Sequence, residues 1–584
     1  MKPELLQGSR SRILASVVLV IAAVFVLRLF YLQVIQHNHY VSLAQQEQVK
    51  KERLPATRGE IYALSGDSPV KLVLNETVYS VFVDPAVIIE NDSADKVEKV
   101  MKAVAGGNVV DDFDKLLDKE DSRYQIIAKR VTRTQAEKIK DEKLSGIGFT
   151  AVSQRVYPEG QLAAQTLGFV NADGVGNYGL EGYMNDELAG KDGRLETVTD
   201  VSDVPLTIGD RNIREPAENG KNIVMSIDRN VQSKVEQALA AGIQRSRATD
   251  ASVVVMDPNT GRVMAMANLP TYNPSEYYKV NDAALFNNGT ISAPYEPGSD
   301  VKTYTMAAAI DKGVATANDT YYNTDSIKVD DRTITNATKG HTGVISFQTA
   351  LTWSLNTGFV TLAERLGNGK EITKTARDTM YEYFHDRLGL GQTTGIELAN
   401  EQKGIIISPD DADGNAVRYS NMSFGQGLDA TLIQVTSGFC ALINGGNYYK
   451  PTVISGYVNG EGEYVQNATP QPAKLGVVKE TTSQQIKEMT YVARSSFRGI
   501  DKAGYYIGGK TGTSQVIKNG VYADDETIAT YLGYGGSDID HPEYVIMVSI
   551  HGDHRILGGS ADAMPIFTDI SNWMLDYLKI QPKG

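Results

Sequence analysis

The chain has 584 residues, of which 41% are hydrophobic and 22% charged, and its formal net charge is −14. This length exceeds what one hydrophobic core supports, so two or more domains are expected. The acidic balance argues against non-specific binding of nucleic acid, which relies on a basic face, and we expect no nucleic-acid partner. The single cysteine, Cys440, excludes an intramolecular disulfide and is predicted to be a buried core residue.

The first predicted element is an apolar helix near the N-terminus. Ile13–Leu27 contains one polar residue, Ser16, and 29–32 extend the run. A helix of about twenty such residues spans roughly 30 Å of hydrocarbon. Three basic residues precede it and predict a cytoplasmic N-terminus: Lys2, Arg10 and Arg12. A cleaved signal peptide is the alternative, but no small-residue cleavage site follows. We therefore expect a single-pass protein of the cell membrane, with everything after the anchor outside the cytoplasm.

The segments after the anchor differ in composition and predict separate parts. Residues 37–54 are polar and helix-prone, which suggests a stalk. From Pro55 to about Val201, short strand-like runs alternate with a charged helical stretch, which predicts an elongated, non-catalytic mixed α/β module. An acidic stretch that contains Pro and Asn then resembles a linker. The predicted parts are a cytoplasmic tail (1–12), a transmembrane anchor (13–35), a pedestal domain (36–201), a linker (202–221) and a C-terminal domain (222–584).

The C-terminal domain has strand signals at both of its ends. Asp228 is a good N-cap for an apolar-faced helix, and two apolar runs around the turn Pro258–Gly261 predict a hairpin. Further strand-like runs and an amphipathic helix follow near the C-terminus: 507–516, 528–534, 544–550 and 566–578. This order predicts an α+β fold, in which a five-stranded antiparallel sheet is flanked by the first and last helices and the long middle forms an all-helical subdomain.

Three short motifs carry the chemistry: Ser299-Asp300-Val301-Lys302, Ser354-Leu355-Asn356 and Lys510-Thr511-Gly512-Thr513. The trio is typical of penicillin-binding proteins and β-lactamases. SxxK alone has little weight, because it also begins at Ser68 and Ser93, whereas SxN and KTG each occur once. Ser299 follows Pro297-Gly298 and is predicted to open a helix whose body is Thr303–Ile310. The other two serines lie among turn-forming residues, and we expect solvated turns there, with no helix starting at the serine.

The SxxK spacing has a direct chemical consequence. Residues i and i+3 share a helix face, so the amine of Lys302 is expected beside the hydroxyl of Ser299. Burial and a nearby cation lower the pKa of an amine and let it act as the base that serine needs. Lys510 is predicted to be that cation or to bind a substrate carboxylate. Ser354 is expected to relay the proton to the leaving amine, and Asn356 to hold the substrate backbone.

The KTG motif lies in the predicted strand Gly508–Val516. Its glycines suit an edge strand that pairs with an extended peptide. The backbone N–H groups of Ser299 and Thr513 are predicted to form the oxyanion hole. The predicted catalytic residues are Ser299, Lys302 and Ser354, and the predicted substrate-binding residues are Asn356, Lys510, Thr511, Gly512 and Thr513. No CxxC, HExxH or histidine ligand spacing is present, so neither a metal nor another cofactor is expected.

At these residues the chain resembles the class B penicillin-binding proteins, which are monofunctional transpeptidases of cell-wall synthesis. The resemblance extends over nearly the whole chain and includes Arg58-Gly59-Glu60-Ile61, Arg155 with Tyr157-Pro158 and Gly160, Gly179-Leu180-Glu181, Tyr295–Ser299 and Gly425-Gln426-Gly427. Two features depart from the family pattern. Tyr62–Gly66 replaces an Asp-Arg-Asn-Gly turn, and Asp300 stands where Thr or Val is commoner.

The resemblance implies a reaction and its partners. Ser299 would attack the D-Ala–D-Ala amide of a donor stem peptide and release D-Ala, and an amine of an acceptor stem peptide would resolve the acyl-enzyme into a cross-link. β-Lactams would acylate the same serine. A SEDS-family glycosyltransferase in the membrane is the expected partner, and Tyr295–Gly298 favours a division-type over an elongation-type enzyme.

Two other functions compete with transpeptidation. The first is a D,D-carboxypeptidase or β-lactamase-like hydrolase, which needs a base for deacylation by water. The nearest sequence match to such a base, Glu364 in Glu364–Asn368, is imperfect. The second is a non-catalytic β-lactam-binding scaffold or sensor, against which the intact trio argues.

Overall fold

A computed structural model describes residues 9–40, 49–198, 213–518 and 520–583. They belong to two compact units, Met1–Thr57 with Gly190–Gly220, and Arg58–Ala189 with Lys221–Gly584. Lys2 and most of the predicted linker, 199–212, lie outside the described residues. The predicted pedestal, 36–201, is therefore divided between the two units instead of forming one of them.

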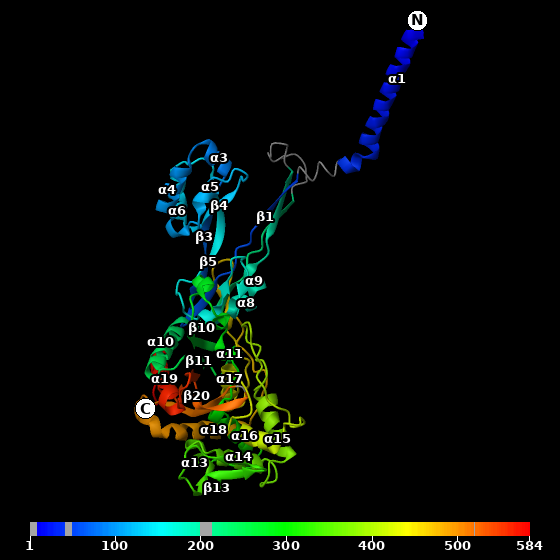
Figure 1. The fold of residues 1–584 in the computed structure, drawn as a ribbon. Coiled ribbons are helices and arrows are strands. Elements are labelled where there is room, and N and C mark those ends of the chain that lie inside the picture. Colours follow the sequence, from blue (N-terminus) through cyan, green and yellow to red (C-terminus); the bar gives the residue numbers. More distant parts are fainter. Residues whose placement is uncertain (1–8, 41–48, 199–212, 519, 584) are drawn as a thin grey trace. The chain divides into compact units, whose positions relative to one another are not determined.

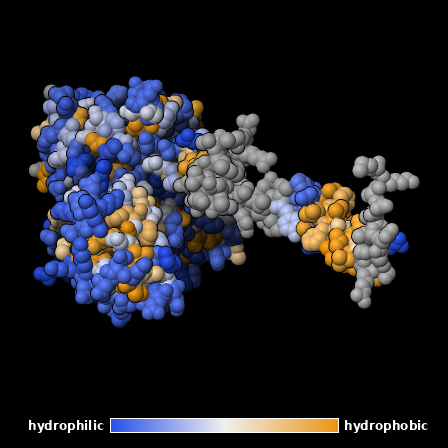
Figure 2. Space-filling view, turned by 90° about the horizontal axis from the view of Figure 1, so that it is seen from above, coloured by the Kyte–Doolittle hydropathy of each residue, from blue (hydrophilic) through white to orange (hydrophobic). Residues whose placement is uncertain are grey.

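The smaller unit contains the apolar helix and a small sheet. Helix α1 (Ser9–Phe30) continues into the π-helical turn η1 (Tyr31–Ile35), and Arg12–Ile35 is long and apolar enough to cross a membrane. Its exposed hydrophobic surface is orange in Figure 2. Strands β1 (Val49–Leu54), β8 (Gly193–Val198) and β9 (Ile213–Glu215) form an antiparallel sheet. Of the segment predicted to be helix-prone, 37–54, residues 37–40 are helical and 41–48 lie outside the described residues. Strand β1 corrects the prediction for 49–54, because pairing with β8 overrides local propensity.

The larger unit contains a seven-stranded sheet to which both predicted domains contribute. The strand order is β18-β17-β10-β2-β3-β4, and β5 also pairs with β3. The strands are β2 (Ile61–Ser65), β3 (Ser68–Val83), β4 (Gln125–Val131), β5 (Ile147–Val156), β10 (Asn222–Asp228), β17 (Ile454–Val458) and β18 (Tyr464–Gln466). Strand β10 runs parallel to β2. The predicted boundary near residue 222 thus crosses a continuous sheet.

Four helices pack against β3, β4 and β5 around a separate hydrophobic core: α3 (Pro85–Glu90), α4 (Ala94–Val104), α5 (Phe113–Leu117) and α6 (Arg133–Asp141). Helix α4 begins directly after Ser93, so the expectation that no helix starts at that serine is wrong. The Ser93 hydroxyl donates to the carbonyl of Ile88 at 3.3 Å, and Lys96 is exposed. This second SxxK therefore lacks the buried amine that a nucleophile needs.

A buried ion-pair cluster joins three segments that carry the family resemblance. Glu181 lies on α8 (Gly179–Tyr183), and its side chain is completely buried. One carboxylate oxygen is 2.6 Å from Nη2 of Arg58, and the other is 2.7 Å from Nε of Arg155. The remaining small elements nearby are α7 (Ala164–Leu167), α9 (Asn185–Ala189), β6 (Phe169–Val170) and β7 (Gly176–Asn177). The three charges neutralise one another only in part, and Glu181 is their shared anion.

Replacement of Glu181 by Gln is expected to destabilise this part of the protein strongly. It leaves two buried guanidinium groups without an anion, which typically costs about 3–5 kcal/mol. Denaturant unfolding of the full-length protein, followed by circular dichroism, measures the change. The control is Glu137→Gln, which breaks an exposed pair with Arg133 and is expected to have no measurable effect. Equal transition midpoints for the two variants would contradict the prediction.

The predicted five-stranded sheet is confirmed, with the order β12-β11-β21-β20-β19 and antiparallel pairing throughout. Its strands are β11 (Asp250–Met256), β12 (Val263–Leu269), β19 (Tyr506–Lys518), β20 (Val521–Gly536) and β21 (Tyr544–His551). Helices α10 (Arg229–Ser246) and α19 (Met564–Tyr577) pack on one face, as expected (Figure 1). Asp228 caps α10 by accepting from the N–H groups of Asn230 and Val231. Strand β19, which carries the KTG motif, lies at the edge.

Helices cover the other face of this sheet and form the adjoining subdomain. They are α11 (Gly289–Ser292), α12 (Lys302–Asp311), α13 (Phe347–Thr352), α14 (Asn356–Arg365), α15 (Lys374–Tyr381), α16 (Ala416–Met422), α17 (Leu432–Ile443) and α18 (Glu480–Ala493). Short 3-10 or π turns are η2 (Gly106–Asn108), η3 (Pro274–Lys279), η4 (Ala283–Phe286), η5 (Gly298–Val301), η6 (Glu382–Arg387), η7 (Arg494–Ile500) and η8 (Gly559–Ala563). Cys440 is buried in α17, as predicted.

The subdomain that was predicted to be all-helical also contains two antiparallel strand pairs. Strand β13 (Thr320–Asn323) pairs with β16 (Gly343–Ser346), and β14 (Ser326–Val329) pairs with β15 (Arg332–Thr335). These runs of four residues are rich in Thr, Tyr, Ile and Val, which favour strands, but they are too short to show a clear period in the sequence.

Candidate active site

Ser299 lies in a tight turn between two elements. It is the second residue of η5, a 3-10 turn that leads into α12, so the helix proper begins at Lys302 and not at the serine. Gly298 has φ +62, and a Cβ atom there would lie 2.8 Å from the carbonyl oxygen of Thr513. Glycine therefore lets this turn approach β19 closely. Ser299 itself is only half-buried, which leaves its hydroxyl accessible.

The amine of Lys302 lies beside the hydroxyl of Ser299, as the SxxK spacing predicts. The distance from Nζ to Oγ is 3.0 Å. The same amine donates to the carbonyl of Ser354 and to Oδ1 of Asn356, both at 2.7 Å. Lys302 is completely buried, and this burial, together with the charge of Lys510, holds the pKa of its amine well below the ordinary value. A neutral amine in this place can accept a hydroxyl proton.

Ser354 connects the two amines of the site. Its Oγ is 3.1 Å from Nζ of Lys302 and 2.9 Å from Nζ of Lys510. Its φ is +57, a left-handed conformation that is uncommon outside glycine and is often found at functional sites. Burial lowers the pKa of Lys510 to about 8, although the charge of Asp300 acts in the opposite direction. A proton can thus pass from one amine to the other through one hydroxyl.

Both the oxygen and the nitrogen of the Asn356 side-chain amide form hydrogen bonds within the protein. Oδ1 accepts from Lys302, and Nδ2 donates to the carbonyl of Thr335 on β15 at 2.9 Å. The contact of Asn356 with the Lys302 amine was not predicted from the sequence, and the contact with the amide of the substrate backbone stays a prediction. Glu364 lies eight residues further along α14, about 12 Å at the rise of an α-helix. Burial raises its pKa to about 7.

The glycines of β19 serve the packing of the strand on its own sheet. A Cβ atom at Gly508 or Gly509 would lie within 2.6 Å of the ring atoms of Tyr534 or the hydroxyl of Tyr531. The sequence-based explanation, that these two glycines leave room for a peptide, is therefore not needed. Lys510 and Gly512 are buried on one face, while Thr511 is half-buried and Thr513 exposed on the other, because side chains alternate along a strand.

Gly512→Ala is expected to disrupt the site. The added methyl carbon would lie 2.1 Å from Oγ1 of Thr530 and 2.7 Å from a carboxylate oxygen of Asp300. Such overpacking typically costs about 1–3 kcal/mol and displaces neighbouring groups. We expect a lower melting temperature and slower labelling by a fluorescent penicillin. Gly460→Ala is the control, because a methyl group there meets nothing within 4 Å. Equal melting temperatures and labelling rates for the two variants would show that β19 can shift to make room for the methyl group, and would contradict the prediction.

Two neighbouring loops hold the approach to Ser299, and their contacts were not predicted. Glu296 is buried and accepts from the N–H of Gly427 at 2.6 Å and from the hydroxyl of Tyr522 at 2.9 Å. The N–H of Gly298 donates to the carbonyl of Gly425 at 2.9 Å. The family segment Gly425–Gly427 therefore fixes the turn that carries the serine. Its Gly-Gln-Gly pattern was the only sequence signal for this role.

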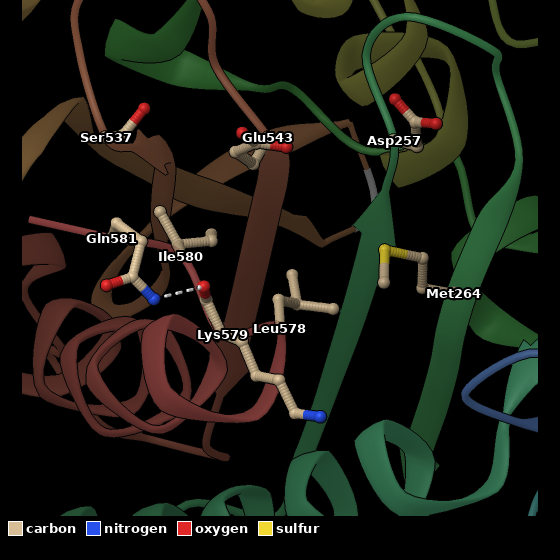
Figure 3. Close-up of a pocket in the computed structure, with 8 residues that line it drawn as sticks. All are labelled: Asp257, Met264, Ser537, Glu543, Leu578, Lys579, Ile580 and Gln581. Carbon is tan, nitrogen blue, oxygen red and sulfur yellow. Dashed lines mark hydrogen bonds between the residues drawn. The ribbon is translucent and has the colours of Figure 1, made fainter.

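A cavity of about 420 Å³ lies elsewhere in the C-terminal domain (Figure 3). The residues that follow α19, Leu578–Gln581, form one wall, and Asp257, Met264 and Glu543 lie opposite. None of the predicted site residues lines it. Acidic residues and histidines also gather near the start of β20, where Glu526 is shared by two potential metal-ligand groups. Glu526 already contacts His551 and Lys518, so ion pairing accounts for this cluster without a metal.

Comparisons with known proteins agree with this architecture. The family model described as "Penicillin binding protein transpeptidase domain" matches residues 251–572, and "Penicillin-binding Protein dimerisation domain" matches residues 53–225. Stage V sporulation protein D of Bacillus subtilis is 29% identical over 562 residues, covering 95% of this chain and 84% of that protein. The probable peptidoglycan D,D-transpeptidase PenA of Neisseria meningitidis is 27% identical and covers 100% of this chain and 94% of that protein.

Solved structures lead to the same class. Penicillin-binding protein 3 of Mycobacterium tuberculosis in complex with aztreonam is 25% identical, with a TM-score of 0.66, and the match covers 91% of this chain and 98% of that one. Penicillin binding protein 2X of Streptococcus thermophilus shares the fold, with a TM-score of 0.71 at 23% identity over 91% of this chain and 80% of that one. The chain belongs to the penicillin-binding transpeptidase family, and the combination of dimerisation and transpeptidase domains makes it a class B penicillin-binding protein.

Proposed function

We propose that this protein is a peptidoglycan D,D-transpeptidase and that Ser299 is its nucleophile. The observation that carries the proposal is the 3.0 Å contact between Ser299 Oγ and the buried amine of Lys302, which shares Ser354 with Lys510. The relative named probable peptidoglycan D,D-transpeptidase PenA supports the reaction. In this proposal 222–584 is the transpeptidase domain and 36–201 the pedestal.

In the first step, Lys302 takes the proton of Ser299 while Oγ attacks the carbonyl carbon between the two D-Ala residues of a donor stem peptide. The developing oxyanion is held by the backbone N–H groups of Ser299 and Thr513, which the tight approach of Gly298 to β19 brings near each other. The proton then passes through Ser354 to the departing D-Ala amine, the C–N bond breaks, and a serine ester remains.

Substrate contacts come mainly from β19. As an edge strand, Lys510–Thr513 offers backbone groups to an extended donor peptide, and protonated Lys510 attracts its terminal carboxylate. Asn356 contributes by holding the Lys302 amine. In the second step, an amine of an acceptor stem peptide attacks the ester, gives up a proton through the same amines, and restores Ser299. β-Lactams acylate Ser299 in place of the donor peptide, and the resulting acyl-enzyme does not react with the acceptor amine. The aztreonam complex of a relative agrees with this proposal.

The apolar helix would anchor the enzyme with its N-terminus in the cytoplasm and its catalytic domain outside. Basic residues before the span support this orientation. A SEDS-family glycosyltransferase in the membrane is the proposed partner of the anchor and pedestal. A division-type role agrees with the Tyr295–Gly298 segment.

A stem-peptide thioester tests the reaction. The full-length protein is incubated with the thioester, with and without an acceptor amine, and the lifetime and fate of the acyl-enzyme are followed by mass spectrometry. A transpeptidase releases the acyl group faster when the acceptor is present and forms the cross-linked amide. Rapid release to water that the acceptor does not change would identify a hydrolase instead. Absence of an acyl-enzyme would support a non-catalytic scaffold or sensor.

A further inference from the structure

Asp300 directly follows the nucleophile, but it has no part in the proposed acylation or in substrate binding. Its side chain is completely buried. One carboxylate oxygen accepts from Oγ1 of Thr530 at 2.6 Å, while the other is buried without a hydrogen-bond partner. A buried carboxylate with an unsatisfied oxygen is costly unless nearby charge compensates it. The family resemblance offers no explanation, because this position usually holds an uncharged residue.

The carboxylate lies between the elements that carry the two amines. A Cβ atom at Gly512 would lie 2.7 Å from the bonded oxygen of Asp300, so the carboxylate rests against β19. Lys510 is two residues before Gly512 and therefore on the same face of the strand. Asp300 lies in η5, and Lys302, two residues later, is the first residue of α12. Neither amine is a hydrogen-bond partner of Asp300 among the residues that the structure describes, so their interaction acts through space in a poorly screened interior.

The positive charge of the two amines near Ser299 is balanced by the carboxylate of Asp300. The site holds two buried amines, which share the hydroxyl of Ser354 and repel each other when both are protonated. The other titratable side chains that face Asp300 are phenols whose pKa burial raises, so they stay neutral: Tyr295, Tyr304 and Tyr531. One carboxylate then neutralises one protonated amine, and the second amine is left uncharged.

We propose that Asp300 is the counterion of the Lys302–Lys510 pair, a positioning residue whose charge keeps Lys510 as the cation of the site, while burial and that cation leave Lys302 as the neutral base. The proposal rests on the proposed function of Ser299. It also gives a reason for Gly512 and Thr530, since the first makes room for the carboxylate and the second bonds it. The register of β19 and β20 pairs these two residues directly.

The titration of the groups agrees with this arrangement. Burial raises the pKa of Asp300 to about 7, against the opposing influence of the Thr530 hydrogen bond and the two amines. The charge of Asp300 in turn raises the pKa of both Lys510 and Lys302. Loss of that charge lowers both amine pKa values. The acid limb of the reaction reports protonation of the base Lys302, and the alkaline limb reports deprotonation of the cation Lys510, so both limbs should move to lower pH.

Asp300→Asn tests the proposal, because Asn keeps the shape and the acceptor for Thr530 but removes the charge. The second-order rate of acylation of the full-length protein by a fluorescent penicillin is measured across the pH range. We expect both limbs to shift to lower pH by about one unit or more. Asp569→Asn is the matched control, because it removes an exposed carboxylate from α19 and should move neither limb. Thr530→Val keeps the carboxylate of Asp300 but removes the hydrogen bond that it accepts, so both limbs should shift to lower pH by less than in Asp300→Asn.

The possible outcomes are distinct. In one outcome, the pH profile of the acylation rate of Asp300→Asn has the same two limbs as that of the wild type and only a lower maximum. That result would make Asp300 a structural residue and overturn the proposal. If Asp300→Asn does not fold, Thr530→Val carries the test, and unshifted limbs there overturn it as well. Failure of the wild type to react with penicillin at all would instead contradict the proposed function.

Discussion

Replacement of Ser299 by Ala is expected to abolish covalent labelling of the protein by a fluorescent penicillin. The hydroxyl is the only group that forms the acyl bond in the proposed reaction, and loss of such a nucleophile lowers turnover by a factor on the order of 10⁶. The fold should survive, because Ser299 is half-buried and the loss of its hydroxyl creates little cavity. Gel fluorescence measures labelling, and circular dichroism verifies folding.

The chain supplies its own controls for this experiment. Ser68 and Ser93 also begin SxxK sequences, and Ser93 even precedes a helix. Ala at either position should leave labelling at the level of the wild type, because neither serine has a buried amine beside it. Persistent labelling of Ser299→Ala, or loss of labelling in Ser68→Ala or Ser93→Ala, would place the nucleophile elsewhere.

Lys302→Met should slow acylation by a factor of about 10²–10⁴, the usual contribution of a general base. Met has a similar length and removes the amine that lies 3.0 Å from Ser299 Oγ. Because Met leaves the carbonyl of Ser354 and Oδ1 of Asn356 without this donor, the variant should also be less stable by about 1–3 kcal/mol. Stopped-flow acylation and thermal melting measure the two effects, and Lys312→Met, on the exposed end of the same helix, is the control.

Lys302→Arg separates a base from a simple positive charge. The guanidinium stays protonated and cannot take the proton of Ser299, so this variant should be as slow as Lys302→Met. If Arg restored the rate, Lys302 would act by its charge, and another group would have to be the base.

The features that the sequence predicts well are those that depend on local spacing. Ser299 and Lys302 are three residues apart, so the turn alone brings them together, even though the turn is a 3-10 turn and not the start of the α-helix. The apolar run of α1, the cap of Asp228 and the strand-like runs of β11, β12 and β19–β21 are likewise local patterns. The error at Ser93 has the same origin, because Asn, Asp and Ser favour both turns and helix caps.

Other features depended on contacts that no short segment contains. Ser354 and Lys510 are 156 residues apart, and only the packing of the helical subdomain on the edge strand brings the Ser354 hydroxyl to both amines. The strand pairs β13–β16 and β14–β15 form because partner strands satisfy their backbones, which short runs do not signal. The two compact units and the shared seven-stranded sheet also follow from long-range pairing.

The sequence by itself determined the class of chemistry: a serine, a lysine at i+3, and the SxN and KTG motifs, with an apolar helix ahead of them. The tertiary structure decided the electrostatics. It placed Asp300 against Gly512 and Thr530, and it added Lys302 as a partner of Asn356. The physical reason is that a charge in a dry interior is controlled by every group that packs around it, and those groups come from strands and turns far apart along the chain.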